Sequence, residues 1–342
     1  MIVISYRTTA IIDLKKLKEN CAAVRNVVSP KTKICAVVKA DAYGHGGVEI
    51  SRALENHVDY FAVALAEEAV ELRLCGVEKP VLLLLPTDDD GIIRAIRFGF
   101  CLSADSVSYL GKIQALAEKY RAVVGVHIAL NTGMNRFGFE LSELIGALKY
   151  IKKFSNISVK GVFSHFYMPE NDDETEKQFT LFQRGANIVR DAFPGVIRHV
   201  AASGGILAGR RYDLDMVRPG LLLYGYKPFE SVLLDVKPVM RVEAQTIRNV
   251  KLKRGDRLFY GDYGASEDCV ARIVRAGYAD GLRRKGDFTL NNRCMDVSAI
   301  RGEGDGRVIV MDDAQKHARA ENTIAYEILC GVTHRANVVY KE

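Results

Sequence analysis

The sequence lacks three features that would assign it to other classes of protein. Its seven cysteines include no CxxC pair, so neither a zinc site nor a disulfide framework is indicated. It has no block of lysine and arginine, and its formal charge of +6 is spread along the chain, which argues against nucleic acid as a partner. The longest aliphatic run, Val81 to Leu85, is too short to span a bilayer.

Two further absences bear on location and metals. The first 20 residues lack the basic start and apolar core of a signal peptide, and the odd number of unpaired-looking cysteines fits a reducing compartment. We therefore expect a cytoplasmic protein. The histidines form no cluster with metal-ligand spacing, so we expect no metal site.

The chain is long enough for a large domain and a smaller one. At 342 residues, with 48% hydrophobic residues, it can bury a sizeable core. Eight short apolar runs alternate with longer, charged segments of helical spacing, which favours an α/β fold with a (β/α)8 barrel of TIM type. A doubly wound open sheet is the alternative, because periodicity does not show whether a sheet closes. The expected strands are Ile34–Val38, Tyr60–Ala64, Val81–Leu85, Phe98–Leu102, Val123–Ala129, Val159–Phe163, Arg198–Ala201 and Gly220–Tyr224.

The pattern changes after Tyr224. From Val239 onward, alternating runs are separated by turn sequences such as KRGD and GEGDG, which indicates a mostly β domain. We therefore expect the barrel over residues 1–230 and a C-terminal β domain over 231–342. A short N-terminal segment is a candidate to pack on the second domain.

Polar residues follow the ends of several expected strands. Lys39 follows the first, Ser164 and His165 the sixth, and Ser203 the seventh, while Arg218 lies next to the eighth. In a TIM barrel the reactive groups lie beyond the carboxyl ends of the strands, and the last two loops commonly bind phosphate. Each residue alone has a purely structural reading, such as a solvated lysine or a helix cap. Their shared location favours a phosphorylated ligand, and a Schiff base from Lys39 to pyridoxal phosphate becomes a specific possibility.

Two motifs carry a resemblance to a known family. AVVKADAYGHG (residues 36–46) closely resembles the cofactor-lysine motif of alanine racemases, and GYADG (residues 277–281) resembles the motif with that family's catalytic tyrosine. NTGMNRFGF, FSHF, AASG, VRPG, RCMD and AYEILCG match further family landmarks in order. The resemblance covers nearly the whole chain. It implies a fold-type III enzyme that uses pyridoxal 5'-phosphate (PLP), and a homodimer whose active site is shared between subunits.

The resemblance also implies a two-base interconversion of L- and D-alanine. Lys39 would hold PLP as a Schiff base and then serve as the base on one face of the substrate, and Tyr278 would serve on the other. A racemase needs such a pair because a proton removed from one side must be returned to the other. A free phenol and a free ammonium have pKa values of roughly 10 and 10.4, so both bases need help from their surroundings at neutral pH.

The same resemblance assigns the remaining site residues. Arg218 would face the pyridine nitrogen and keep it unprotonated, because a guanidinium can only donate. His165 would lie against the ring, and Arg136 would contact the phenolic oxygen and the substrate carboxylate region. Met295 would offer its backbone N–H to the carboxylate, with Asp296 close by. The expected phosphate ligands are Tyr43, Ser203, Gly220, Leu221 and Tyr326.

One position departs from the family pattern. Many members carry a lysine two residues before the (D/N)TGM motif, and its carbamylated form supports the arginine that follows. Ala129 occupies that position here, and Asn131 replaces the commoner aspartate. Since alanine forms no carbamate, we expect a bound anion such as chloride, or another side chain, to support Arg136.

Several functions stay open at this point. Tyr326 would restrict the pocket to alanine or serine, and an apolar pocket discriminates weakly against one added hydroxyl. A serine or broader racemase is therefore an alternative, as are a role in cell-wall D-alanine supply and one in catabolism. A fold-type III decarboxylase is disfavoured by Arg218, because such enzymes place a carboxylate at the pyridine nitrogen. A non-catalytic PLP protein would leave Tyr278 and Met295 unexplained, and a barrel for a phosphorylated sugar is the remaining alternative.

Overall fold

The computed structural model describes residues 8–231, 234–260, 264–284 and 293–342. Its chain divides into two compact units. The first, called the barrel unit below, comprises Lys18–Ala42 and Gly47–Val236. The second, called the β unit, comprises Met1–Leu17, Tyr43–Gly46 and Lys237–Glu342, as far as these residues are described.

The barrel unit is built on a sheet of eight strands in the order β8-β7-β6-β5-β4-β3-β2-β9. All neighbouring strands in this order pair in parallel. The two end strands approach each other through a bridge between Ala202 and Arg218, so the barrel is nearly closed. The strands are β2 (Lys33–Val37), β3 (Tyr60–Val63), β4 (Val81–Leu83), β5 (Cys101–Ala104), β6 (Val124–Ala129), β7 (Ile157–Phe163), β8 (Ile197–His199) and β9 (Met216–Val217).

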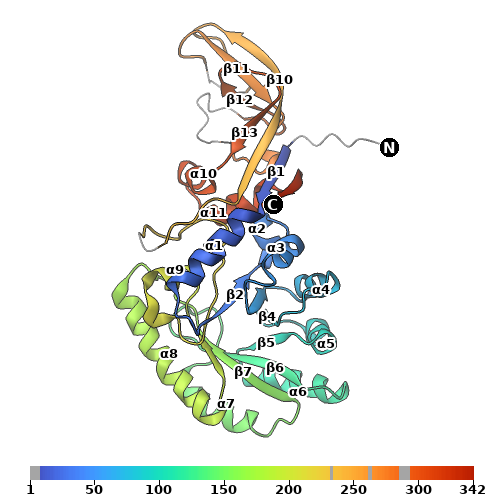
Figure 1. The fold of residues 1–342 in the computed structure, drawn as a ribbon, viewed down its shortest axis with the longest axis vertical. Helices are drawn as coiled ribbons and strands as arrows, with labels where there is room; N and C mark the ends of the chain where they lie inside the picture. The colour runs from blue at the N-terminus through green and yellow to red at the C-terminus, as the bar shows by residue number, and fades with distance from the viewer. Residues whose placement is uncertain (1–7, 232–233, 261–263, 285–292) are drawn as a thin grey trace. The chain divides into compact units, whose positions relative to one another are not determined.

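Amphipathic helices cover the outside of these strands (Figure 1). The longest, α8 (Asp172–Ala192), buries Phe179, Phe182 and Val189 at helical spacing. It begins where the Asn171 side chain accepts the Glu174 N–H, as a helix start requires. The others are α1 (Leu14–Val27), α3 (Gly47–Leu54), α4 (Ala66–Leu74), α5 (Asp89–Phe98), α6 (Val107–Lys119), α7 (Leu141–Ile151) and α9 (Ser203–Ala208).

Apolar side chains from the strands fill the interior of the barrel unit. Ile34, Phe61, Leu82, Leu102 and Val126 come from five successive strands and are fully buried. Burial of each such side chain contributes about 1.5–3 kcal/mol relative to exposure. The expected α/β fold with a TIM-type barrel is confirmed.

Two of the expected strands are wrong in part or in whole. Residues 220–224 form consecutive turns, in which the Leu223 N–H donates to the Gly220 carbonyl at 2.9 Å. The eighth strand is instead β9, a few residues earlier. The run looked like a strand because it is buried, and its Tyr224 hydroxyl donates to the Val37 carbonyl at 2.9 Å. Phe98, expected to open a strand, ends α5, which Gly99 terminates in a left-handed conformation.

The β unit holds a six-stranded sheet in the order β12-β11-β10-β1-β14, with β13 also paired to β10. Strand β1 pairs antiparallel with β10 and parallel with β14, so the start of the described chain lies between strands from its last third. The strands are β1 (Thr8–Asp13), β10 (Met240–Leu252), β11 (Cys269–Val274), β12 (Ser298–Arg301), β13 (Arg307–Met311) and β14 (Ala336–Lys341), and the helices are α10 (Ala314–Ala320) and α11 (Ala325–Val332).

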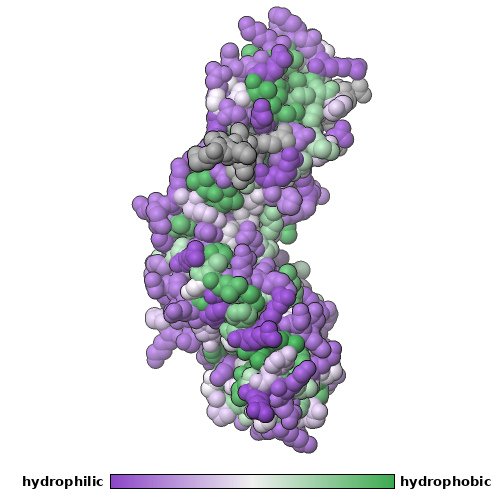
Figure 2. Space-filling model, turned by 90° about the vertical axis from the view of Figure 1, so that its right-hand side faces the viewer, coloured by the Kyte–Doolittle hydropathy of each residue, from purple (hydrophilic) through white to green (hydrophobic). Residues whose placement is uncertain are grey.

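One face of the molecule shows how hydropathy is distributed on its surface. On the face shown in Figure 2, polar residues predominate and hydrophobic residues form small groups between them. Across the described ranges, no helix combines the length and the hydropathy needed to cross a membrane.

Candidate active site

Lys39 follows β2 after a single residue, Val38, and begins α2 (Lys39–Gly44), whose turn is left-handed. The residues from Ala40 to Tyr43 have φ between 51° and 56°, and Gly44 has φ 78°. A left-handed conformation costs an L-residue roughly 1–2 kcal/mol, so the turn needs support from outside. Part of that support is visible: Glu68 accepts the Ala40 N–H at 2.6 Å, and Asp41 accepts the Gly47 N–H at 2.6 Å.

Arg218 is a buried cation that is hydrogen-bonded to neutral groups. One nitrogen donates to His199 Nδ1 at 2.8 Å, and the other donates to the carbonyls of Ser164 at 2.8 Å and Val200 at 3.3 Å. Within the described part of the chain, no carboxylate forms an ion pair with it. Burial lowers the pKa of Arg218 to about 10, so it stays charged at neutral pH.

Two buried histidines extend this network. Because Arg218 can only donate, His199 Nδ1 must accept. The proton of His199 therefore lies on Nε2, which is 2.8 Å from His127 Nδ1 and donates to it. Burial, with the Arg218 charge, lowers the pKa of His127 to about 3 and that of His199 well below its usual range. Gly161 makes room for the pair, since a Cβ there would lie 2.2 Å from His127 Nδ1.

His165 lies among three cations. Burial, followed by the charges of Arg218, Arg136 and Lys39 in that order, lowers its pKa to about 3. Its Nδ1 is 3.4 Å from Arg218. The imidazole is therefore neutral in a strongly positive environment, which suits the binding of an anionic molecule.

Arg136 lines a small cavity together with Ala129, Asn131 and His165. The cavity measures about 20 Å³, which is room for one water-sized ligand. The Arg136 guanidinium lies over the Phe137 ring, 5.0 Å from its centroid, and no described side chain offers it an ion pair. Asn131 does not support it, since its side chain bonds to Glu140 and to its own loop.

The loops after β8 and β9 are joined through Ser203. Its hydroxyl oxygen accepts the N–H groups of Gly220 at 3.1 Å and Leu222 at 3.3 Å. Gly204 packs so closely that a Cβ there would lie 2.3 Å from Pro169. Ser203, Gly220 and Leu221 are therefore brought together, as expected for a phosphate-binding loop pair.

Two tyrosines expected at the phosphate belong to the β unit. The rings of Tyr43 and Tyr326 lie 5.4 Å apart between centroids, at 44°. Burial raises the pKa of both phenols above the ordinary value. Both hydroxyls are therefore protonated at neutral pH and able to donate.

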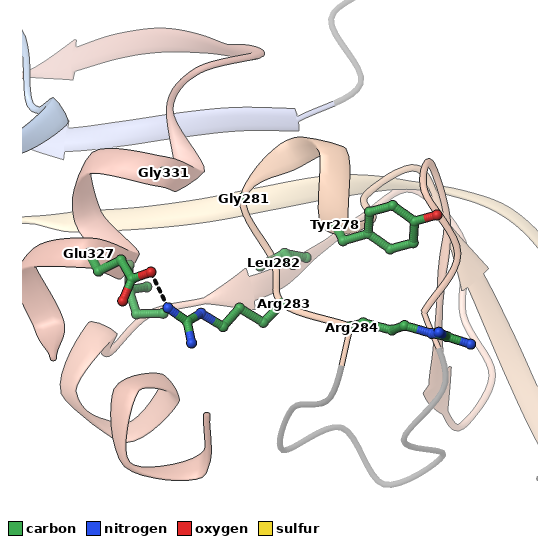
Figure 3. A pocket seen from close by; sticks show the side chains of 8 residues that line it. Tyr278, Gly281, Leu282, Arg283, Arg284, Glu327 and Gly331 are labelled. Carbon is green, nitrogen blue, oxygen red and sulfur yellow. Dashed lines mark ion pairs between the residues drawn. The ribbon is translucent and has the colours of Figure 1, made fainter. Parts of the chain in front are cut away.

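Tyr278 lies in the β unit on a short 3-10 turn, Tyr278–Asp280. The residue is 42% exposed and lines an open pocket of about 520 Å³. Figure 3 shows the Tyr278 ring and the Arg284 side chain extending to the same side, while Arg283 points to Glu327. The turn is fixed by its backbone, because the N–H groups of Tyr278 and Ala279 donate to the carbonyls of Cys294 at 3.2 Å and Met295 at 2.9 Å.

The structure thus gathers the expected residues into two groups. The barrel unit holds Lys39, Arg136, His165, Ser203, Arg218, Gly220 and Leu221, and the β unit holds Tyr43, Tyr278, Met295, Asp296 and Tyr326. Sequence reasoning assigned no functional role to His199 or to its partner His127. The usable signal for His199 was its place at the end of a barrel strand, where reactive groups of this fold lie. No described group of histidine, cysteine and acidic residues could hold a metal ion.

Comparison with known families identifies the family of this chain. Residues 12–228 match the N-terminal domain of alanine racemase, and residues 239–340 match its C-terminal domain. The chain belongs to the alanine racemase family. The racemase of Clostridium tetani is 32% identical over 364 residues, which cover 96% of this chain and 94% of that protein.

Solved structures of alanine racemases agree with this assignment. That of Clostridium difficile 630 has a TM-score of 0.92 at 30% identity and covers 99% of this chain and 97% of its own. That of Bartonella henselae, described with covalently bound pyridoxal phosphate, has a TM-score of 0.87 at 25% identity, with 98% and 100% covered. The expected family, the two-part architecture and the isomerase class are confirmed.

Proposed function

We propose that this protein interconverts L- and D-alanine with PLP, using Lys39 and Tyr278 as the two bases. The observation that carries the proposal is the buried Arg218, a donor-only cation in the same barrel unit as Lys39 and hydrogen-bonded to neutral groups. A decarboxylase of this fold type would need a carboxylate there. Met295 would bind the substrate carboxylate through its backbone N–H, with Asp296 close by.

The donor set of the barrel unit fits PLP. Lys39 offers an amine at the end of a barrel strand, Arg218 can only donate to a pyridine nitrogen, and the Ser203 and Gly220 loops suit a phosphate. The covalently bound pyridoxal phosphate described for the Bartonella henselae enzyme supports this assignment. When bound, PLP would accept the electron pair that remains after α-proton removal.

The protein's own residues would then control two proton transfers. One base would take the α-proton on its face of the α-carbon, and the other base would deliver its own proton to the opposite face. Lys39 Nζ and Tyr278 Oη would be these two bases. Arg218 would hold the pyridine nitrogen unprotonated, which favours return of the proton to the α-carbon. Arg136 and His165 would contact the bound molecule, and Tyr43, Tyr326, Ser203, Gly220 and Leu221 would hold its phosphate. The restricted pocket favours alanine, with serine as the alternative substrate.

The direct test is proton NMR in D2O with chiral analysis. L-alanine, L-serine and L-lysine are each incubated with the protein and PLP. Loss of the α-proton signal of L-alanine together with D-alanine formation is expected, with serine slower and lysine unchanged. An unchanged α-proton in all three amino acids would refute the proposal, and a colourless protein without a PLP absorbance band would point to the sugar-phosphate alternative.

We also propose that the active site is shared between the subunits of a homodimer. Lys39→Ala and Tyr278→Phe would then each lose racemase activity, while a mixture of the two inactive proteins, unfolded and refolded together, would regain part of it. A mixture that stays inactive while each variant forms a dimer would place both bases in one subunit. We further propose a cytoplasmic location, which is supported by the lack of a disulfide among the seven cysteines, all of them described in the structure.

The third part of the proposal concerns Arg136. We propose that an anion such as chloride occupies the cavity beside Ala129, where the exposed Arg136 has room beside it for a single small ligand. Replacing chloride by gluconate at equal ionic strength should raise the KM for alanine severalfold. Equal KM values in the two salts would contradict the anion site.

A further inference from the structure

Arg335 forms ion pairs with carboxylates from two different motifs. Its Nε lies 3.5 Å from Asp280 Oδ1, and one terminal nitrogen lies 3.2 Å from Asp296 Oδ1. Asp280 ends the turn that carries Tyr278, and Asp296 directly follows Met295 in the chain. A single guanidinium therefore links two segments of the chain, which are separated by 15 positions between Asp280 and Met295.

The two carboxylates lie in different environments. The Asp280 side chain is 1% exposed, and its Oδ2 accepts the Gly277 N–H at 2.9 Å, which closes the turn. A buried carboxylate is costly unless a cation compensates it, and Arg335 is that cation. Asp296 is half-exposed, so this second pair orients the guanidinium more than it neutralises a buried charge.

The backbones of the two segments are in direct contact. A Cβ at Gly277 would lie 2.3 Å from the Cys294 carbonyl oxygen and 2.4 Å from that of Met295. On its other side the turn packs against α11, where a Cβ at Gly281 would lie 2.4 Å from Gly331 (Figure 3). The exposed Tyr278 ring therefore extends from a tightly held turn, and a shift of that turn would move the phenol oxygen.

We propose that Arg335 is a positioning residue that holds the Tyr278 turn against the Met295–Asp296 segment. The inference rests on the proposed function, in which Tyr278 moves the proton and the Met295 N–H binds the carboxylate. Arg335 would set the distance between these two groups without touching the substrate. Since misplacement by about 1 Å can cost 10²-fold in rate, its loss should impair proton transfer by Tyr278 more than that by Lys39, which the barrel unit carries.

The first experiment measures α-proton exchange in D2O from each alanine enantiomer separately. In Arg335→Met, exchange from the enantiomer whose proton faces Tyr278 should slow at least tenfold more than exchange from the other, and the KM should rise. Arg335→Lys should be intermediate, because an ammonium lacks the planar fork that reaches two carboxylates. Arg301→Met is the matched control, since Arg301 lies in the same unit and pairs with the exposed Glu267. Equal slowing of both enantiomers would overturn the inference.

The second experiment does not depend on activity. Backbone amide exchange of residues 277–280, followed by mass spectrometry, should be about tenfold faster in Arg335→Met and unchanged in Arg301→Met. Asp296→Asn, which leaves the Asp280 pair in place, should give a smaller increase and serves if Arg335→Met does not fold. Unchanged amide exchange in all variants would overturn the inference, whereas a wild-type protein that racemises no alanine would overturn the proposed function alone.

Discussion

Arg218 in the barrel unit and Arg335 in the β unit are held by opposite kinds of partner. Arg218 is buried and donates to an imidazole and to carbonyl oxygens, whereas Arg335 is partly exposed and pairs with two carboxylates. Neutral partners orient a cation without cancelling its charge, while carboxylates cancel it. The barrel unit thus keeps a positive potential available to a bound molecule, and the β unit uses its arginine to fix the chain.

The substitution with the largest expected effect is Lys39→Ala in the barrel unit, which should reduce the rate of racemisation. If Lys39 is both the cofactor attachment and one base, racemisation should fall by about 10⁴-fold or more, roughly 5.5 kcal/mol in the barrier. Chiral analysis of alanine measures this, and Lys253→Ala, at an exposed lysine paired with Asp268, is the control. Residual activity within tenfold of wild type would remove Lys39 from the mechanism.

Acid should lower the free energy of unfolding, because the histidines around Arg218 are held neutral in the folded protein. An unfolded histidine binds a proton below about pH 6.5, but the folded pKa values of His127 and His165 are about 3 and that of His199 is also strongly lowered, by burial first. The unfolded state therefore binds more protons in this window, and stability falls as the pH drops from about 6.5 toward 3. The expected loss in the free energy of unfolding is about 1.4 kcal/mol per pH unit for each histidine, or roughly 4 kcal/mol per pH unit for the three together.

Urea unfolding between pH 7 and 5 measures this loss. His127→Gln removes one of the three protons, so its stability should depend on pH about one third less steeply than that of wild type. A free energy of unfolding that stays constant between pH 6 and 5 would show that these histidines are not held neutral.

A smaller and more local break is Gly161→Ala. The added Cβ would lie 2.2 Å from His127 Nδ1, so the histidine pair must shift, and we expect a loss of about 1–3 kcal/mol in the free energy of unfolding. Gly146→Ala in α7, with no atom within 4 Å of the added Cβ, should instead gain about 0.5–1 kcal/mol. Thermal unfolding of both variants measures these changes. Equal changes in stability in the two variants would argue against close packing of the histidines at Gly161.

The smallest expected change in stability concerns an exposed ion pair in the β unit. Arg301→Met removes an exposed pair with Glu267, which should change the free energy of unfolding by less than about 1 kcal/mol. Urea unfolding gives the value. If Arg335→Met lowers the free energy of unfolding no more than Arg301→Met does, then the position of Arg335 between two motifs adds nothing to stability.

The barrel could be predicted because each strand and helix has its own local hydrophobic pattern. The eighth strand was misplaced because the apolar run at residues 220–224 reflects burial, which turns share with strands. The left-handed turn after Lys39 gave no signal, since residues 40–43 contain no glycine, and it depends on distant partners such as Glu68. The positions of His199 and Arg335 depend in the same way on contacts between segments far apart in the sequence.

The place of β1 in its sheet has a consequence for biosynthesis. Thr8 pairs with Ala244 on one side and with Ala336 on the other. At the usual speed of translation these partners follow roughly 10 to 70 s after β1 itself. Until β10 and β14 have both been made, the nascent chain carries a strand with at least one open edge, the kind of surface that recruits other chains. The β unit can therefore be completed only after β14 has left the ribosome, which makes any factor that shields β1 until then a determinant of yield.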